Sequence, residues 1–165
     1  MNTGEKKRKL LITGGAGFIG TNLIFDLMAD GEREIIVIDN ESLGNPDQIL
    51  DCDIEYIRGD ITDEYLVRSV LKDVDEVVHL AADTRVIESI EDPSKNFDIN
   101  VRGTFGLLKA ARDAGVKRFI NASTGGAILG DRTPPINEEM AAQPISPYGA
   151  AKLAVEGYCS AFQGA

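Results

Sequence analysis

The chain has 165 residues, enough for one domain with a buried core, and 43% of them are hydrophobic, as in ordinary globular proteins. Its formal net charge of −10 argues against a nucleic-acid partner, which would need a basic face, and its apolar stretches are too short to span a membrane. The single histidine excludes sites built from several histidines, and the two cysteines show neither a CxxC pattern nor metal-ligand spacing. We therefore expect reduced thiols, a cytoplasmic protein and no metal site.

The first predicted elements are a short strand at 9–13, a glycine-rich turn and a helix over 18–30. Gly14 suits a tight turn, a missing side chain at Gly17 lets a pyrophosphate approach the backbone, and one at Gly20 lets the helix pack closely on a sheet. The helix N-terminus then presents free N–H groups to the phosphates. Glycines in this spacing fit a dinucleotide site, but taken alone they fit a plain tight turn equally well.

The second predicted strand, at 34–39, favours the dinucleotide interpretation. It ends in Asp39, about 20 residues after the glycine turn, the separation typical of a carboxylate that binds an adenosine ribose. A 2′-phosphate would meet this carboxylate, and the neighbouring Asn40 adds no positive charge. The sequence therefore predicts NAD rather than NADP.

The remaining elements continue the alternation of strands and helices that is typical of a parallel α/β sheet. Strands are predicted at 53–58, 76–80 and 118–122, helices at 63–71, 93–114 and from about 147 onward, and a loop at 125–147. Right-handed crossovers give a Rossmann-type, doubly wound sheet with strand order 3-2-1-4-5. The fifth strand would then be an uncovered edge, so we expect residues 1–165 to form a single but incomplete NAD-binding domain.

Further candidates follow the third and fourth strands. Asp60 stands where the adenine end of a dinucleotide would lie, although an acid before a helix is as often only a turn residue. His79 closes the fourth strand, where we favour a packed strand residue over a catalyst. The small residues Ala81 and Ala82 come next and leave room for a ligand at the sheet crevice.

Tyr148 and Lys152 are candidates for catalysis because positions i and i+4 of a helix share a face. A lysine near a phenol favours the phenolate, which can serve as a general base, and the lysine can also donate to a ribose hydroxyl. Taken alone, such a pair is more often a solvated helix face. Ser123 and Thr124 end the fifth strand and offer a hydroxyl that could polarise a substrate oxygen.

In their order, these motifs resemble the NAD-dependent epimerase/dehydratase family of the extended short-chain dehydrogenase/reductase superfamily. The matching stretches are TGGAGFIG at 13–20, VIDN at 37–40, GDIT at 59–62, HLAA at 79–82, NVRGT at 100–104, ASTGGAI at 122–128 and SPYGAAK at 146–152. The resemblance implies a set of cofactor-binding residues: Gly14, Gly17, Phe18, Ile19, Gly20, Asp39, Asn40, Asp60, Ile61, Leu80, Ala81, Ala82, Asn100, Tyr148 and Lys152. Within this set, Asn100 would stabilise the backbone of the active site.

The resemblance also implies a mechanism. Tyr148 would be the base that assists hydride transfer at a sugar hydroxyl carbon, Lys152 would tune it, and Thr124, or alternatively Ser123, would be the catalytic hydroxyl. Family members are longer and carry a substrate domain in their second half, so we expect the NAD-binding half of a nucleotide-sugar epimerase or dehydratase, with weak or no turnover by itself. An NAD-dependent carbonyl reductase and a non-catalytic dinucleotide-binding sensor module are the alternatives.

The sequence differs from the family pattern at two places, and the resemblance also predicts an oligomeric state. Leu129 stands where relatives usually carry a tyrosine, and the residues 83–85 differ from the commonest family sequence. Relatives commonly dimerise through a four-helix bundle, which predicts a homodimer made by the helices at 93–114 and from 147. Its apolar residues would be Val101, Phe105, Leu108, Ala111, Leu153, Val155, Tyr158 and Phe162, unless they all pack on the sheet.

Overall fold

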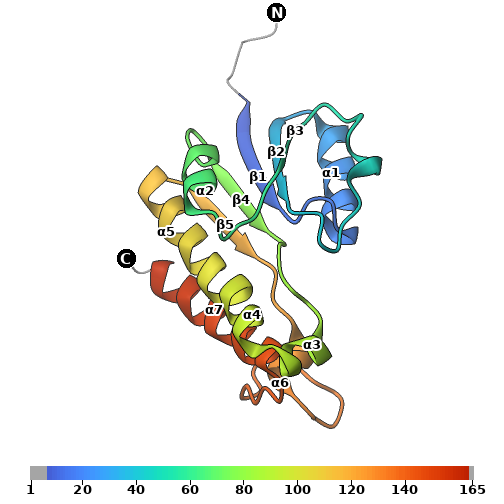
Figure 1. Cartoon of the computed structure of the whole chain (residues 1–165), viewed down its shortest axis with the longest axis vertical. Coiled ribbons are helices and arrows are strands. Elements are labelled where there is room, and N and C mark those ends of the chain that lie inside the picture. Colours follow the sequence, from blue (N-terminus) through green and yellow to red (C-terminus); the bar gives the residue numbers. More distant parts are fainter. Residues whose placement is uncertain (1–6, 164–165) are drawn as a thin grey trace, which may run out of the picture.

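The computed structural model describes residues 7–163; residues 1–6 and 164–165, the two ends of the predicted domain, lie outside the described residues. Five parallel strands form one sheet in the order β3-β2-β1-β4-β5, which confirms the predicted topology. The strands are β1 (Arg8–Thr13), β2 (Arg33–Asp39), β3 (Glu55–Arg58), β4 (Glu76–His79) and β5 (Arg118–Asn121). Figure 1 shows α1 (Phe18–Asp30) on one face of this sheet and α2 (Glu64–Val70) and α5 (Thr104–Ala114) on the other.

The core has two halves because successive strand residues point to opposite faces. On the α1 face, Ile12 and Val37 pack with Ile24 of the helix. On the opposite face, Leu11 and Ile38 pack among residues of α2 and α5. Since both faces are covered, the central strands read as continuous apolar runs in the sequence.

The remaining helices lie beyond the carboxyl ends of the strands, beside α5 or, in the case of the short turn at Pro46–Gln48, beside α1 (Figure 1). They are the short turn η1 (Pro46–Gln48), α3 (Val86–Glu91), α4 (Pro93–Phe97), η2 (Asp98–Gly103), α6 (Gly125–Leu129) and α7 (Pro147–Gln163). The predicted helix at 93–114 is present as α4, η2 and α5 in succession, and its middle segment, η2, is a π-helix.

Three details of the predicted elements were wrong. β3 begins at Glu55 rather than at 53, α3 was not predicted, and α6 lies within the predicted loop. Both missed helices are too short to show a helical repeat. In addition, α6 starts with two glycines, which disfavour helix in isolation.

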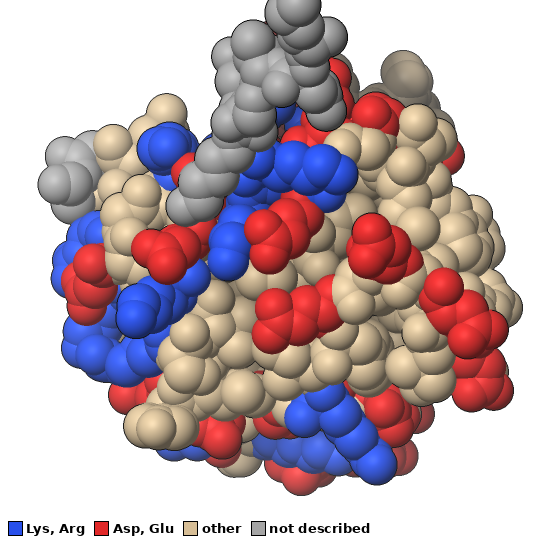
Figure 2. Space-filling model, turned by 90° about the horizontal axis from the view of Figure 1, so that it is seen from above, with Lys and Arg blue, Asp and Glu red and all other residues tan. Residues whose placement is uncertain are grey.

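Charged side chains of both signs are interspersed on the face seen in Figure 2. At the amino ends of the strands, Glu76 pairs with both Arg8 and Arg33, and Lys117 pairs with Asp75. Glu76 is buried and joins β4 to both β1 and β2, whereas the pair of Lys117 is exposed on the lysine side and contributes about 0–1 kcal/mol. No helix among residues 7–163 is long and apolar enough to cross a membrane.

Candidate cofactor and catalytic site

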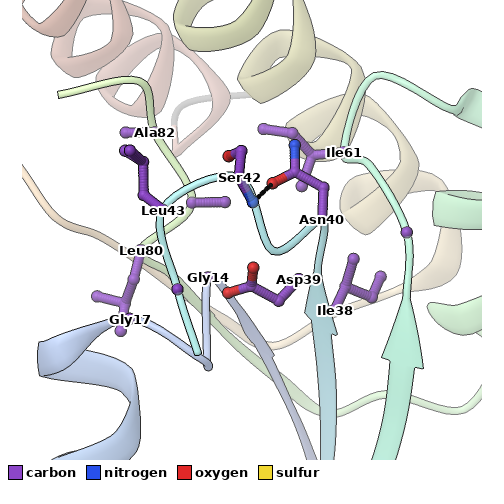
Figure 3. Close-up of a pocket in the computed structure, with 13 residues that line it drawn as sticks. Gly14, Gly17, Ile38, Asp39, Asn40, Ser42, Leu43, Ile61, Leu80 and Ala82 are labelled. Atoms are coloured by element: carbon purple, nitrogen blue, oxygen red, sulfur yellow. Dashed lines mark hydrogen bonds between the residues drawn. The ribbon is translucent and has the colours of Figure 1, made fainter. Parts of the chain in front are cut away.

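A pocket opens where β1, β2 and β4 end, at the crevice in which parallel sheets bind ligands (Figure 3). It is lined by many of the predicted cofactor residues: Gly14, Gly17, Asp39, Asn40, Ile61, Leu80, Ala81 and Ala82. Ile38, Ser42, Leu43, Gly44 and Gly59 complete the wall. None of these five was predicted. A Cβ on Gly44 would lie 2.7 Å from the backbone of Ala16, so the loop approaches the glycine turn closely, and this approach depends on the tertiary fold.

Gly14, Gly17 and Gly20 have different roles in the turn. Gly14 has a φ of 73°, and a Cβ on it would lie 2.6 Å from the backbone nitrogen of Ala81. A Cβ on Gly20 would lie 2.6 Å from the carbonyl oxygen of Gly14. A Cβ on Gly17 would have only that same oxygen nearby, at 3.3 Å. Gly14 and Gly20 therefore permit close packing, whereas Gly17 leaves space beside the turn.

The N-terminus of α1 suits the phosphates of a dinucleotide. Gly17 caps the helix without a side chain, so no side chain occupies the N–H groups of the first turn. Phe18, which begins this turn, is 87% exposed, and Ile19 is also exposed. Open space at Gly17 together with uncapped N–H groups fits a pyrophosphate.

Asp39 connects β2 to the glycine turn. Its Oδ2 accepts a hydrogen bond from the backbone nitrogen of Ala16 at 3.0 Å, and its Oδ1 accepts one from that of Glu41 at 2.7 Å. The carboxylate is therefore fixed in place, and each of its oxygens keeps a lone pair for a ligand hydroxyl.

Asn40 and Asp60 meet at the rim of the pocket. Asn40 Nδ2 donates to Asp60 Oδ2 at 2.7 Å, and Asp60 Oδ1 accepts from both the backbone and the hydroxyl of Thr62. Burial raises the pKa of Asp60, but these hydrogen bonds outweigh it and bring the pKa below its usual value. Asp60 thus organises the turn after β3, and its neighbour Ile61 lines the pocket.

His79 is a packed, neutral residue beneath the crevice. Its Nδ1 lies 2.6 Å from Thr13 Oγ1, and its Nε2 lies 2.8 Å from Thr104 Oγ1. Burial, and secondarily the positive charge of Lys152, lowers its pKa from 6.5 to about 3. The backbone nitrogen of Ala81 donates to the same Thr13 hydroxyl, so this buried chain supports the pocket wall.

Tyr148 and Lys152 lie on the first turns of α7, and both are buried. Lys152 Nζ donates to the carbonyl oxygen of Ala122 at 2.8 Å, directly before Ser123. Burial raises the pKa of Tyr148 and lowers that of Lys152. The lysine was expected to favour the phenolate, but in this structure the pKa of Tyr148 shifts the other way, because burial desolvates the phenol.

The two candidate hydroxyls differ in their partners. Ser123 Oγ donates to Glu156 Oε1, which lies one turn beyond Lys152 on α7. Thr124 caps α6, and its side chain makes no capping hydrogen bond. Both residues line a second cavity, which Glu156 borders as well. Glu156 was not predicted, although its spacing of four from Lys152 could have indicated the shared face.

Asn100 lies in the π-helix η2 and holds the chain after β4. Its Oδ1 accepts from the backbone nitrogen of Asp83 and its Nδ2 donates to the carbonyl oxygen of Asp83, both at 2.9 Å. Asn96, four residues earlier, also donates to this carbonyl at 3.2 Å. Arg85 binds the Asp83 carboxylate with two hydrogen bonds and thereby lowers its pKa. The helical spacing of the two asparagines was the available signal for Asn96.

Comparison with known sequences gives one consistent family. The sequence profile of the NAD dependent epimerase/dehydratase family matches residues 10–165. A UDP-glucose 4-epimerase of Mycolicibacterium smegmatis is 37% identical over 163 residues, which cover 94% of this chain and 51% of that protein. The chain thus spans about half the length of the curated relatives it matches.

Solved structures agree with this result. A UDP-glucose 4-epimerase from Thermus thermophilus, in complex with NAD, superimposes with a TM-score of 0.89 at 37% identity, covering 94% of this chain and 51% of that one. A dTDP-glucose 4,6-dehydratase from Streptomyces venezuelae, with NAD bound, gives a TM-score of 0.86 at 34% identity and the same coverages of 94% and 51%.

Proposed function

The chain belongs to the NAD-dependent epimerase/dehydratase family, and we propose that it is the NAD-binding half of a nucleotide-sugar epimerase or dehydratase. The observation that supports this most is the pocket in which the glycine turn, the fixed carboxylate of Asp39 and the small residues after β4 meet. The cofactor predicted from the sequence is the one on which the family depends. Asp39 favours NAD over NADP because a 2′-phosphate would approach its carboxylate.

When bound, NAD would accept a hydride from a sugar carbon and could return it. The residues of this chain supply the proton chemistry beside it. Tyr148 removes the proton of the sugar hydroxyl, and Thr124, whose hydroxyl makes no capping bond, donates to the substrate oxygen. Lys152 keeps two N–H donors after its bond to Ala122, enough for a ribose hydroxyl and for the phenolate form of Tyr148, which takes the hydroxyl proton and becomes the phenol.

The substrate is a nucleotide sugar, and the residues that choose the sugar belong to a substrate domain like the second half of the longer relatives. The chain alone then has weak or no turnover. The protein is cytoplasmic and forms a homodimer through α5 and α7.

Binding of NADH, followed by its own fluorescence, tests the cofactor site. We expect saturable binding by the wild-type chain and at least tenfold weaker binding by Gly17→Val, because the added side chain fills the space at the turn. Gly17 has a φ of −77°, which suits any residue, so this variant should fold. Gly106→Val, at a helix position with open space, is the control. Equal binding by Gly17→Val and the wild type would refute the site.

The catalytic roles of Tyr148, Thr124 and Ser123 are tested by measuring turnover in a longer form of the protein that carries a substrate domain. Tyr148→Phe removes only the ionisable hydroxyl, so we expect kcat to fall about 10²–10⁴-fold while the dissociation constant of NADH stays within twofold. Thr124→Ala should lower kcat by a smaller factor than Tyr148→Phe, and Ser123→Ala by a smaller factor still. Retention of more than a tenth of kcat by Tyr148→Phe would contradict the role of the tyrosine. A larger loss of kcat in Ser123→Ala than in Thr124→Ala would assign the catalytic hydroxyl to Ser123.

A further inference from the structure

Glu41 follows the predicted ribose-binding residues and has an unusual backbone conformation. Its φ is 59°, in the left-handed region that costs a non-glycine residue about 1–2 kcal/mol. The hydrogen bond from its backbone nitrogen to Asp39 Oδ1 holds it there. This conformation turns the chain between Asn40 and Ser42, which both line the pocket (Figure 3).

The side chain of Glu41 is engaged by two residues of the neighbouring strand β3. Its Oε1 accepts a hydrogen bond from Tyr56 Oη at 3.2 Å, and its Oε2 pairs with Arg58 Nε at 3.1 Å. Burial, together with the hydrogen bond to Glu41 and the negative charges of Asp39 and Glu41, raises the pKa of Tyr56 to about 12. The carboxylates of Asp39 and Glu41 therefore both lie close to Tyr56 in β3.

Arg58 lies beside Asp39 in the sheet. The two residues are partners in the parallel register of β2 and β3, so their side chains point to the same face. The Arg58 side chain is 74% exposed, and a guanidinium is well suited to bind phosphate through two parallel hydrogen bonds. Without a carboxylate partner, it would be a ready ligand for a phosphate near the ribose pocket.

We propose that Glu41 is a second determinant of cofactor choice, which pairs with Arg58 and so withholds this guanidinium from the 2′-phosphate of NADP. The inference rests on the proposed NAD site and adds to the repulsion by Asp39. Glu41 acts through Arg58 and needs no contact with the cofactor. Removal of its charge should therefore change the binding of NADPH and leave that of NADH nearly as it was.

A double-mutant cycle tests the proposal. The dissociation constants of NADH and NADPH are measured by fluorescence at low salt for Glu41→Gln, Arg58→Ala and the double variant. Glutamine keeps the size of Glu41 and can still accept from Tyr56, but it lacks the charge. We expect Glu41→Gln to bind NADPH about tenfold more tightly, with NADH within twofold of the wild type. Adding Arg58→Ala should abolish the gain.

Two further measurements distinguish the proposal from a structural effect. Tyr56→Phe loses a hydrogen bond to Glu41 but keeps the ion pair, so its ratio of NADPH to NADH affinity should equal that of the wild type. The gain in Glu41→Gln should shrink with added salt. An unchanged ratio in Glu41→Gln, or a gain that survives Arg58→Ala, would overturn the proposal. A wild-type chain that binds neither cofactor would instead refute the proposed function, and this inference with it.

Discussion

At the scale of single residues, the buried His79 couples stability to pH. Its pKa falls from 6.5 to about 3 on folding, so below pH 6.5 the unfolded chain binds a proton that the folded chain does not. The free energy of unfolding should therefore decrease as the pH falls from 6.5 toward 3, by about 1.4 kcal/mol per pH unit from this residue alone.

Urea unfolding at pH 7 and pH 5 measures this contribution. We expect the wild type to lose about 2 kcal/mol more over this interval than His79→Gln, whose side chain does not titrate. Carboxylates contribute equally to both proteins and cancel in the comparison. If the two proteins lose the same stability, His79 is not held neutral in the fold.

A change to alanine at Gly14 and at Gly106 is expected to have opposite effects on stability. Gly14→Ala places a Cβ 2.6 Å from the backbone of Ala81 at a φ of 73°, so we expect a loss of about 2–4 kcal/mol in the free energy of unfolding. Gly106→Ala adds a Cβ in open space within α5 and should stabilise by up to about 1 kcal/mol. Denaturant unfolding measures both changes in the free energy of unfolding. An unchanged free energy of unfolding in Gly14→Ala would mean that the turn can accommodate a Cβ at this position.

At the scale of elements, the π-helix η2 serves to aim Asn100 at the chain after β4. Both hydrogen bonds of this side chain go to the backbone of Asp83. Asn100→Leu would leave these buried groups with fewer partners, so we expect a loss of about 2–4 kcal/mol and faster hydrogen exchange at the amide of Asp83. Asn22→Leu, at an exposed position of α1, is the control. Exchange at Asp83 that stays as slow as in the wild type would contradict this role.

The strands and the long helices were predicted better from the sequence than the π-helix and the short helices that connect them. The order of the sheet follows from apolar strands such as 34–39 and from right-handed crossovers, and both are local rules. The π-helix and the short helices α3 and α6 depend on tertiary contacts, such as the bond from the Tyr148 nitrogen to Ser89 Oγ. Likewise, Asp39 could be found by spacing, whereas the pairing of Glu41 with Arg58 depends on the register of β2 and β3.

At the scale of the whole molecule, the predicted dimer interface is narrower than the sequence indicated. Four of the predicted interface residues are buried within the chain and are not available to a partner: Val101, Leu108, Ala111 and Val155. The aromatic rings at this surface remain: Phe105 is 39% exposed and contacts the rings of both Tyr158 and Phe162. Leu108→Glu would therefore bury a charge and unfold the protein instead of testing association.

Sedimentation at several concentrations tests the dimer through these aromatic residues. We expect a dimer that Phe105→Glu weakens at least tenfold, without a change in the unfolding midpoint large enough to indicate loss of the fold. Tyr65→Glu, at an exposed position of α2, should leave association unchanged. A monomer at high concentration would contradict the interface, as would association that ignores Phe105→Glu.

NAD is expected to bind at the glycine turn and the end of β2. The chain of 17.8 kDa is small enough for amide NMR, which locates a ligand residue by residue. Addition of NAD is predicted to shift most strongly the amides of Phe18, Ile19 and Gly20 in the first turn of α1, followed by those near Asp39 and Ala81. Amides that do not move, or shifts confined to the second cavity at Ser123 and Glu156, would contradict the account.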